Sequence, residues 1–189
     1  MDIDPSSLFI RDFPDPILRR RADPVPDIDD TVRAVAQRMI DLMVEAEGIG
    51  LAAPQIGLAL RLFVAHVPPL LEDGRAPGDE PETCQTEPEV FLNPSLRDFG
   101  GELIPFEEGC LSLPEIRGEV RRPDEVTLDA TTLDGHPVTR RASSLLARCW
   151  QHEVDHLDGV LIIDRMTPMA RLKNRAKIRD LERQAAETR

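Results

Sequence analysis

Apolar residues recur at intervals of three and four along two stretches of the chain, which is the spacing of one helix face. In the first stretch they are Val32, Val35, Met39, Ile40 and Met43. Asp29 and Asp30 precede them, and their carboxylates can accept hydrogen bonds from the free N–H groups of a first helical turn. Gly48 can end the helix. The pattern predicts a helix between these residues.

A second helical pattern begins at Ser143 or Ser144, either of which can cap it, and closes at Asp158-Gly159. It carries Leu145, Leu146, Cys149, His152 and His156. A third helix is predicted for residues 167–189, because Pro168 follows Thr167 and proline is tolerated at the first helical position. Residues 168–189 contain seven basic and three acidic side chains, so this helix is positively charged.

Shorter apolar runs predict strands. Residues 60–67, 90–94 and 160–163 are rich in apolar side chains, and the second run, VFLNP, ends in a turn signal. In residues 125–139, apolar and polar residues alternate up to Asp134-Gly135, a strong hairpin signal. Strands and helices together predict an α+β fold, in which small antiparallel sheets surround the second helix and a further helix ends the chain.

Two segments follow neither pattern. GIGLAAPQIG, at 48–57, combines three glycines and a proline with small residues, which suits an irregular segment lying close to other groups. Residues 68–89 contain five prolines and an excess of acidic residues, and predict a surface loop. At 189 residues the chain is long enough for one buried core, so we expect a single domain spanning 1–189.

The charge of the chain limits its partners. Thirty-five acidic and 23 basic residues give a net charge of −12, which argues against general nucleic-acid binding. The N-terminus, MDIDPSSLFIRDFPDP, lacks the basic and apolar regions of a signal peptide, and no run of 18 apolar residues occurs. We therefore expect a cytoplasmic protein with no membrane contact. Its three widely spaced cysteines predict separate thiols in a reducing compartment.

The stretch QHEVDHL, at 151–157, has the spacing of a metal site. His152 and His156 are four residues apart, so on a helix both project from one face and can meet a single ion. Glu153 lies about 100° round from His152, where its carboxylate can reach a water on that ion. The alternative is a charged, solvated helix face.

A catalytic metal also needs a third protein ligand and an open position for water. The residues after His156, LDGVLII, supply no third histidine. Glu182 and Glu187 lie on the basic helix and are expected to be solvated. The remaining candidate is Cys110, in EEGCLSLP at 107–114.

Free cysteines are often ordinary core residues, but the neighbours of Cys110 favour a ligand. Gly109 frees the backbone before it, and Pro114 stiffens the strand expected after it. Cys84 lies among acids that disfavour a thiolate, and Cys149 is expected to line a wall beside His152.

Three motifs in this order resemble the signature motifs of the peptide deformylases: GIGLAAPQIG, EEGCLSLP and QHEVDHLDG. The similarity also includes PDPILRRRA and VFLNP, so it extends from about residue 13 to residue 166. It implies an enzyme that removes the N-formyl group from the formylmethionine of newly made polypeptides and releases formate. The length of the acidic loop departs from the compact bacterial members of the family.

The resemblance also implies roles for individual residues. The implied metal ligands are Cys110, His152 and His156. They would bind one divalent ion, Fe²⁺ in the cell, with Zn²⁺ or Ni²⁺ as substitutes. Glu153 is the implied general base and acid. The side chain of Gln55 and the backbone N–H of Leu111 are the implied donors to the oxyanion.

The remaining implied residues bind the substrate. Gly50 and Gly109 match backbone that pairs with the extended peptide in the family. The residues that match the pocket for the methionine side chain are Ile49, Phe106, Leu145 and Cys149. Arg148 lies on the metal face of its helix, and we expect it to pair with Glu108 at the pocket rim, because an unpaired charge there would be costly.

Two other functions fit parts of the pattern. A peptidase that cleaves internal bonds would need a carboxylate or a histidine in the place given to Cys110. A catalytically silent metal-binding or ribosome-associated protein would have no need of Glu153 and Gln55. The resemblance implies that the basic final helix contacts ribosomal RNA. The alternative is a solvated helix that packs through Leu172, Ala176 and Leu181.

Overall fold

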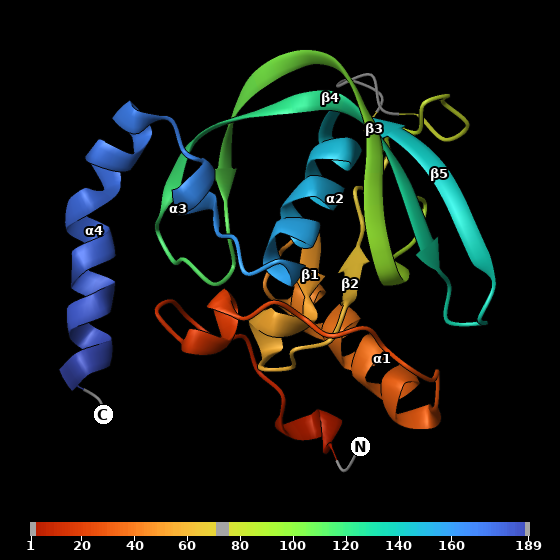
Figure 1. Ribbon diagram of the computed structural model, residues 1–189, viewed down its shortest axis with the longest axis horizontal. Coiled ribbons are helices and arrows are strands. Elements are labelled where there is room, and N and C mark those ends of the chain that lie inside the picture. The colour runs from red at the N-terminus through yellow and green to blue at the C-terminus, as the bar shows by residue number, and fades with distance from the viewer. Residues whose placement is uncertain (1–2, 71–75, 188–189) are drawn as a thin grey trace.

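Five antiparallel strands form one sheet in chain order (Figure 1). The computed structural model describes residues 3–70 and 76–187. The strands are β1 (Gly50–Ala52), β2 (Leu62–Ala65), β3 (Glu89–Gly109), β4 (Arg117–Thr131) and β5 (Pro137–Ser143). The predicted α+β class is confirmed. The expectation of several small sheets is wrong for the described residues, because β3 pairs with β2 at its start and with β4 along the rest.

Helices lie on both sides of this sheet and at its edge. They are α1 (Asp30–Glu45), α2 (Ser144–Leu157), α3 (Ile162–Arg165) and α4 (Pro168–Glu187), with short 3₁₀ turns η1 (Pro5–Ser7), η2 (Pro16–Arg19) and η3 (Ala53–Ile56). In Figure 1, β3 and β4 curve over α2, while α1 lies at the lower right and α4 at the left. Helix α2 contacts all five strands, so residues on it can meet residues from distant parts of the chain.

Both long helices predicted from periodicity are confirmed. At the start of α1, the carboxylate of Asp29 accepts a hydrogen bond of 2.8 Å from the N–H of Val32. At the start of α2, Ser143 is the capping residue, but its side chain makes no capping hydrogen bond. After α2, Gly159 has a φ of 74°, and a Cβ there would lie 2.5 Å from the carbonyl oxygen of Arg19. Only glycine fits this close approach without strain.

The turn predicted at Asn93-Pro94 is not a turn but an irregularity within β3. Pairing with β4 changes register between Leu92 and Ser95, and Asn93 has a φ of 51°. The side chain of Asn93 bonds to both backbone groups of Val25, at 2.8 and 2.9 Å. A bulge bends a strand without ending it, so β3 continues to Gly109 and curves over α2.

Two shorter predictions are also wrong. The residues after Cys110 form a turn instead of a strand, closed by a 3.0 Å bond from the N–H of Leu113 to the carbonyl of Cys110. The apolar run at 160–163 is not a strand, because Ile162 begins the single helical turn of α3. The carboxylate of Asp164 accepts a 2.9 Å bond from the N–H of Leu161 at the start of that turn. A short apolar run alone does not distinguish these structures.

The acidic segment 68–89 is only partly a surface loop. Residues 71–75 lie outside the described residues. Cys84 and Gln85 are buried, and Gln85 accepts a 3.2 Å bond from the N–H of Val67. The N–H of Glu82 bonds to the carbonyl of Arg141, which ties the segment to β5.

Helix α4 packs through a different stripe from the one predicted. Leu172 and Ala176 are exposed, and only Leu181 of the predicted set is partly buried. The buried residues are Ala170 and Asn174, followed by the partly buried Ile178. The amide of Asn174 donates a 2.8 Å bond to the carbonyl of Arg117, so α4 is fixed to β4 near its start.

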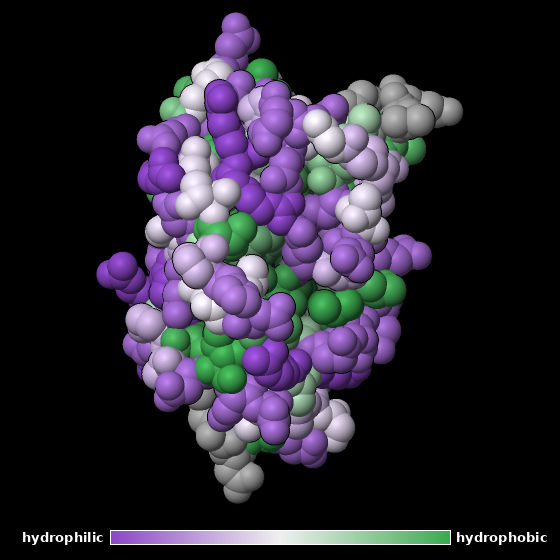
Figure 2. Space-filling view, turned by 90° about the vertical axis from the view of Figure 1, so that its right-hand side faces the viewer, coloured by the Kyte–Doolittle hydropathy of each residue, from purple (hydrophilic) through white to green (hydrophobic). Residues whose placement is uncertain are grey.

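The surface is dominated by polar side chains. Figure 2 shows one face on which hydrophilic residues predominate, with hydrophobic residues gathered mainly in patches at mid-height and below. Within residues 3–70 and 76–187, no helix combines the length and the apolar character needed to cross a membrane.

Candidate metal centre and active site

Three residues from two distant segments bring their ligand atoms together. Cys110 follows the end of β3, while His152 and His156 are one turn apart on α2. Their ligand atoms all lie within 4.8 Å of one another. The Sγ of Cys110 is 3.2 Å from the Nε2 of His156. The geometry expected of a Cys-His-His site is therefore present.

The donor chemistry of these residues fits a divalent first-row transition metal. One thiolate and two imidazoles suit zinc, ferrous iron and related ions, and three protein ligands leave a position open for water. Beside these ligands, one buried carboxylate oxygen of Glu153 has no hydrogen-bond partner among the described residues. An unpaired carboxylate oxygen in the interior is costly unless a ligand or water meets it. The donor set and this unpaired oxygen both fit a metal and a water at this place.

Glu153 is buried beside the three ligands. Its side chain packs against β1, where a Cβ on Gly50 would lie 2.3 Å from its Oε1 and 2.9 Å from the Sγ of Cys149. Glycine at this position thus allows β1 to lie close to α2, as expected from the composition of the segment. Burial raises the pKa of Glu153 to about 7, which suits a group that both accepts and donates a proton near neutrality.

The amide of Gln55 is held in one orientation. Its Oε1 accepts a 2.8 Å bond from the N–H of Ala52. Its Nε2 lies 3.3 Å from the Oγ of Ser112 and 3.6 Å from the Sγ of Cys110. Gln55 is almost fully buried, so its N–H group is directed at the metal ligands and away from solvent.

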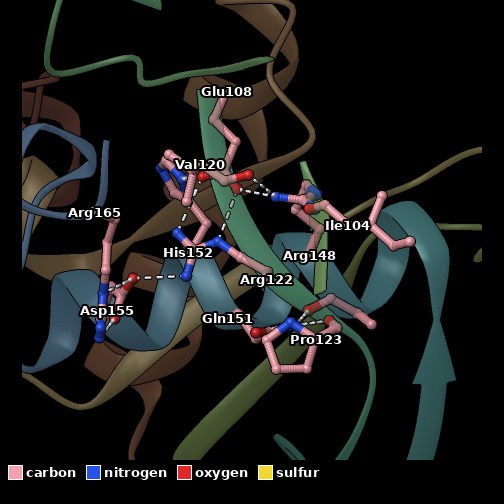
Figure 3. A network of polar contacts seen from close by, with 11 residues as sticks. Ile104, Glu108, Val120, Arg122, Pro123, Arg148, Gln151, His152, Asp155 and Arg165 are labelled. Atoms are coloured by element: carbon pink, nitrogen blue, oxygen red, sulfur yellow. Dashed lines mark hydrogen bonds and ion pairs between the residues drawn. The ribbon is translucent and has the colours of Figure 1, made fainter. Parts of the chain in front are cut away.

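A buried carboxylate orients His152 (Figure 3). Glu108 lies 3.2 Å from the Nδ1 of His152 through its Oε2, which leaves Nε2 for a metal. Arg122 donates two bonds to the same carboxylate, at 2.7 and 3.0 Å. Burial raises the pKa of Glu108, but hydrogen bonds from His152 and Arg122 outweigh it and hold the pKa well below its usual value. Glu108 is therefore ionised.

The expected pairing of Arg148 with Glu108 is confirmed, at 2.6 Å. Both side chains are buried, so the pair lies inside the molecule instead of at the pocket rim. Arg148 also donates a 2.6 Å bond to the carbonyl of Ile104, and its guanidinium lies 5.3 Å from the centre of the Phe106 ring. Arg148 thus connects α2 to the part of β3 that curves over it.

Sequence reasoning missed three members of this network: Arg122, Asp155 and Arg165. Arg122 also donates a 2.8 Å bond to Asp155, which in turn accepts a 2.7 Å bond from Arg165. Asp155 belongs to the QHEVDHL motif, but nothing in the motif distinguishes it from a solvated acid. Arg122 is one of two adjacent arginines on β4, and only the alternation of the strand turns it inward. Its importance depends on contacts between β3, β4 and α2.

A pocket of about 330 Å³ adjoins the three ligands. Every residue predicted for the site lines it except His156, which is buried behind. Lining residues that were not predicted are Glu47, Gly48, Glu107, Leu113, Glu115, Ile116 and Arg117. Four of these are charged, and three of the four, Glu107, Glu115 and Arg117, line the pocket because β3 and the following turn fold back over α2.

The chain matches the model of a known family, polypeptide deformylase, over residues 8–172. The chain belongs to the polypeptide deformylase family. Members of this family are metal-dependent hydrolases that remove the N-formyl group from nascent peptides, and this is the function of the chain. The triad of Cys110, His152 and His156 agrees with that dependence on a metal.

Relatives and solved structures in the deformylase family are similar over most of the chain. Peptide deformylase 2 of Gloeobacter violaceus is 43% identical over 159 residues, which are 84% of this chain and 79% of that protein. The crystal structure of the plant peptide deformylase PDF1B has a TM-score of 0.86 and 36% identity, covering 100% of this chain and 95% of that one. The peptide deformylase of Thermotoga maritima has a TM-score of 0.73 and 38% identity, covering 85% and 98%.

Replacing Arg122 tests the buried network. Arg122→Met would remove the shared partner of Glu108 and Asp155, so we expect unfolding free energy to fall by about 3 kcal/mol. Urea unfolding at one fixed zinc concentration measures this. The matched control is Arg140→Met, because Arg140 also pairs with two acids, at Glu82 and Glu89, but all three are partly exposed. The control should lose about 1 kcal/mol. Equal losses would contradict a special role for the buried network.

Proposed function

We propose that the pocket beside Cys110, His152 and His156 is where the formyl group of an N-formylmethionyl peptide is hydrolysed, with α2 as the central catalytic helix. The observation that carries this proposal is the buried, unpaired carboxylate oxygen of Glu153 in the pocket that Cys110 and His152 also line. An unpaired buried carboxylate adds nothing to packing and is costly, so its presence beside the ligands favours a role in proton transfer.

The proposed ion is bound by the thiolate of Cys110 and one nitrogen each of His152 and His156. When bound, a divalent ion lowers the pKa of a water toward neutrality and so makes hydroxide available at physiological pH. We propose Fe²⁺ as the ion in the cell, with Zn²⁺ or Ni²⁺ able to substitute, since the donor set suits each of them.

Glu153 acts first as general base and then as general acid. Its carboxylate accepts a proton from the attacking water, whose oxygen forms a bond to the formyl carbon. The carboxylic acid then returns this proton to the amide nitrogen as the carbon–nitrogen bond breaks. Formate and a free amino terminus result, and Glu153 is again ionised.

The oxyanion that forms on the formyl oxygen needs donors fixed in advance. We assign this role to the Nε2 of Gln55 and the backbone N–H of Leu111. The hydrogen bond from Ala52 to the Oε1 of Gln55 supports the assignment, because it leaves the N–H end of the amide facing Cys110. Leu111 directly follows Cys110 and lines the same pocket.

Gln55→Ala is expected to lower kcat by about 100-fold to 1,000-fold, because it removes one oxyanion donor. Formate release from a formyl-Met peptide by the metal-loaded variant measures this. Gln85→Ala is the matched control, since Gln85 is also buried and also accepts a backbone N–H, but lies outside the pocket. A Gln55→Ala rate near that of the unmutated protein would remove Gln55 from the mechanism.

We propose that the peptide backbone pairs with Gly50, at the start of β1, and with Gly109, at the end of β3, both of which line the pocket. The proposed surfaces for the methionine side chain are Ile49, Phe106, Leu145 and Cys149. Ile49 and Phe106 expose large apolar side chains at 37% and 49%, which supports an apolar ligand at the mouth. Arg148 and Glu108 shape the wall behind them through their mutual contact.

We also propose that α4 meets ribosomal RNA. Its basic residues include Arg171, Arg175 and Arg179, all exposed, in a chain of net charge −12. Changing Arg171 and Arg175 to Glu should weaken cosedimentation with ribosomes at low salt, because two phosphate contacts are lost. Hydrolysis of a short formylated peptide should be unchanged. Unaltered cosedimentation, compared with Arg33→Glu on α1 as control, would exclude this surface.

Formate release tests the proposed function directly. Metal-loaded protein should release formate from a formyl-Met peptide, and Glu153→Ala should nearly abolish the release. Cleavage of an unformylated peptide at an internal bond would instead favour a peptidase, and metal binding without either activity would favour a silent metal-binding protein.

A further inference from the structure

Both ends of the side-chain amide of Gln55 have hydrogen-bond partners. At one end, Oε1 accepts the 2.8 Å bond from Ala52; at the other, Nε2 is 3.3 Å from the hydroxyl oxygen of Ser112. Gln55 is 1% exposed and Ser112 is fully buried, so water does not compete for these contacts. The two contacts have different consequences for the amide.

The bond from Ala52 decides which end of the amide is oxygen, but it does not by itself fix the direction of the two N–H bonds. An amide nitrogen carries two donors. When Ser112 accepts one of them, the plane of the amide is fixed and the second donor is left for another acceptor. The second acceptor within reach is the Sγ of Cys110, at 3.6 Å, which marks the direction of the metal ligands.

We propose that Ser112 is a positioning residue, whose hydroxyl aims the free N–H of Gln55 at the oxyanion. This inference rests on the proposed role of Gln55. Ser112 does not touch the substrate in this account, since it acts only through the amide. Without its hydroxyl, one N–H of Gln55 would be buried and unpaired, and the amide would rotate toward other acceptors.

Ser112 is itself firmly placed. Its carbonyl accepts a 2.8 Å bond from the N–H of Phe13, in the N-terminal segment. It also lies inside the turn closed by the 3.0 Å bond between Leu113 and Cys110. Three consecutive residues of this turn therefore have three tasks: Cys110 supplies a ligand, Leu111 a backbone donor and Ser112 the acceptor that orients Gln55. A rigid turn suits a residue that must position another to within a fraction of an ångström.

A double-mutant cycle between Ser112 and Gln55 tests the inference, with both residues changed to Ala singly and together. In zinc-loaded protein, Ser112→Ala should lower kcat for a formyl-Met peptide by about 10-fold to 100-fold, because misplacement of a donor costs part of what its removal costs. KM should change by less than about twofold. When Gln55 is already Ala, the Ser112 change should lower kcat by less than about threefold, because there is no amide left to position.

Equal losses in the two backgrounds would overturn the inference and leave the proposed function standing. A Gln55→Ala variant with full activity would remove the proposed role of Gln55 and this inference together.

A second readout requires no substrate. In zinc-loaded protein, hydrogen exchange of the Gln55 side-chain N–H groups, followed by NMR, should be faster in Ser112→Ala. Zinc content and backbone amide exchange around Cys110 should stay as in the unmutated protein. Unchanged exchange at the Gln55 amide, or loss of zinc, would show that Ser112 only supports the turn and would overturn the proposed positioning role.

Discussion

Glu153→Gln should reduce formate release from a formyl-Met peptide by about 100-fold to 10,000-fold, the usual contribution of a positioned acid–base group. The amide has the same shape as the carboxylate but cannot accept the proton of the attacking water. Because Glu153 is not one of the three ligands, the variant should bind as much zinc as the unmutated protein. The loss should therefore appear in kcat and not in metal content.

Glu182→Gln on α4 is the matched control for this change. Glu182 is exposed, and it was expected from the sequence, like Glu187, to be solvated and not to bind the metal. Its replacement should leave both zinc content and formate release unchanged. A Glu153→Gln protein that is fully loaded with zinc and keeps more than about a tenth of the activity would contradict the role of Glu153. Its loss of activity would then be less than about 10-fold, whereas the smallest loss expected is about 100-fold.

Of the three cysteine-to-alanine changes, Cys110→Ala should lower the affinity for metal the most. Removing an outer hydrogen-bonding partner of a metal ligand typically lowers affinity about 10-fold to 100-fold, and removing a ligand itself should cost more than about 100-fold. Competition with a zinc chelator of known affinity measures the change. Formate release should fall with it, because the remaining two imidazoles do not complete the site.

The other two cysteines provide controls of the same chemical kind. Cys84→Ala removes a buried thiol in the acidic segment, and Cys149→Ala removes one that donates a 3.3 Å bond to the carbonyl of Ile49 in the pocket wall. Neither should change zinc affinity by more than about threefold, since neither belongs to the triad. A Cys110→Ala protein that binds zinc as tightly as Cys84→Ala would show that the third ligand is another residue.

Local sequence patterns were sufficient for the parts of the site that lie on one element. The spacing of His152 and His156 on a predicted helix placed both on one face, and α2 is formed as expected. The glycines of residues 48–57 indicated close approach, and Gly50 lies against Glu153. The assignment of Cys110 needed its neighbours and the family resemblance, because a lone cysteine carries little information.

What the sequence did not reveal depends on contacts between distant segments. Arg122 has ordinary surroundings in the sequence, and its contacts come from the curvature of β3 and β4 over α2. Asp155 and Ser112 lie within two of the quoted motifs, but their contacts, with Arg122 and with Gln55, join segments far apart in the chain. That curvature was missed because Asn93-Pro94 has the composition of a turn, whereas its unusual backbone is accommodated as a bulge whose side chain binds Val25. The short apolar run at 160–163 was predicted as a strand for a related reason. Part of it forms the single helical turn of α3, because tertiary packing and not the local pattern determines its structure.

We propose that one divalent ion is bound jointly by the sulfur of Cys110 and by nitrogens of His152 and His156. X-ray absorption spectroscopy at the zinc edge of the zinc-loaded protein measures the ligand set directly. We expect one sulfur at about 2.3 Å and two imidazole nitrogens at about 2.0 to 2.1 Å, with the sulfur shell absent in Cys110→Ala. A spectrum of the unmutated protein with only nitrogen and oxygen neighbours would contradict it.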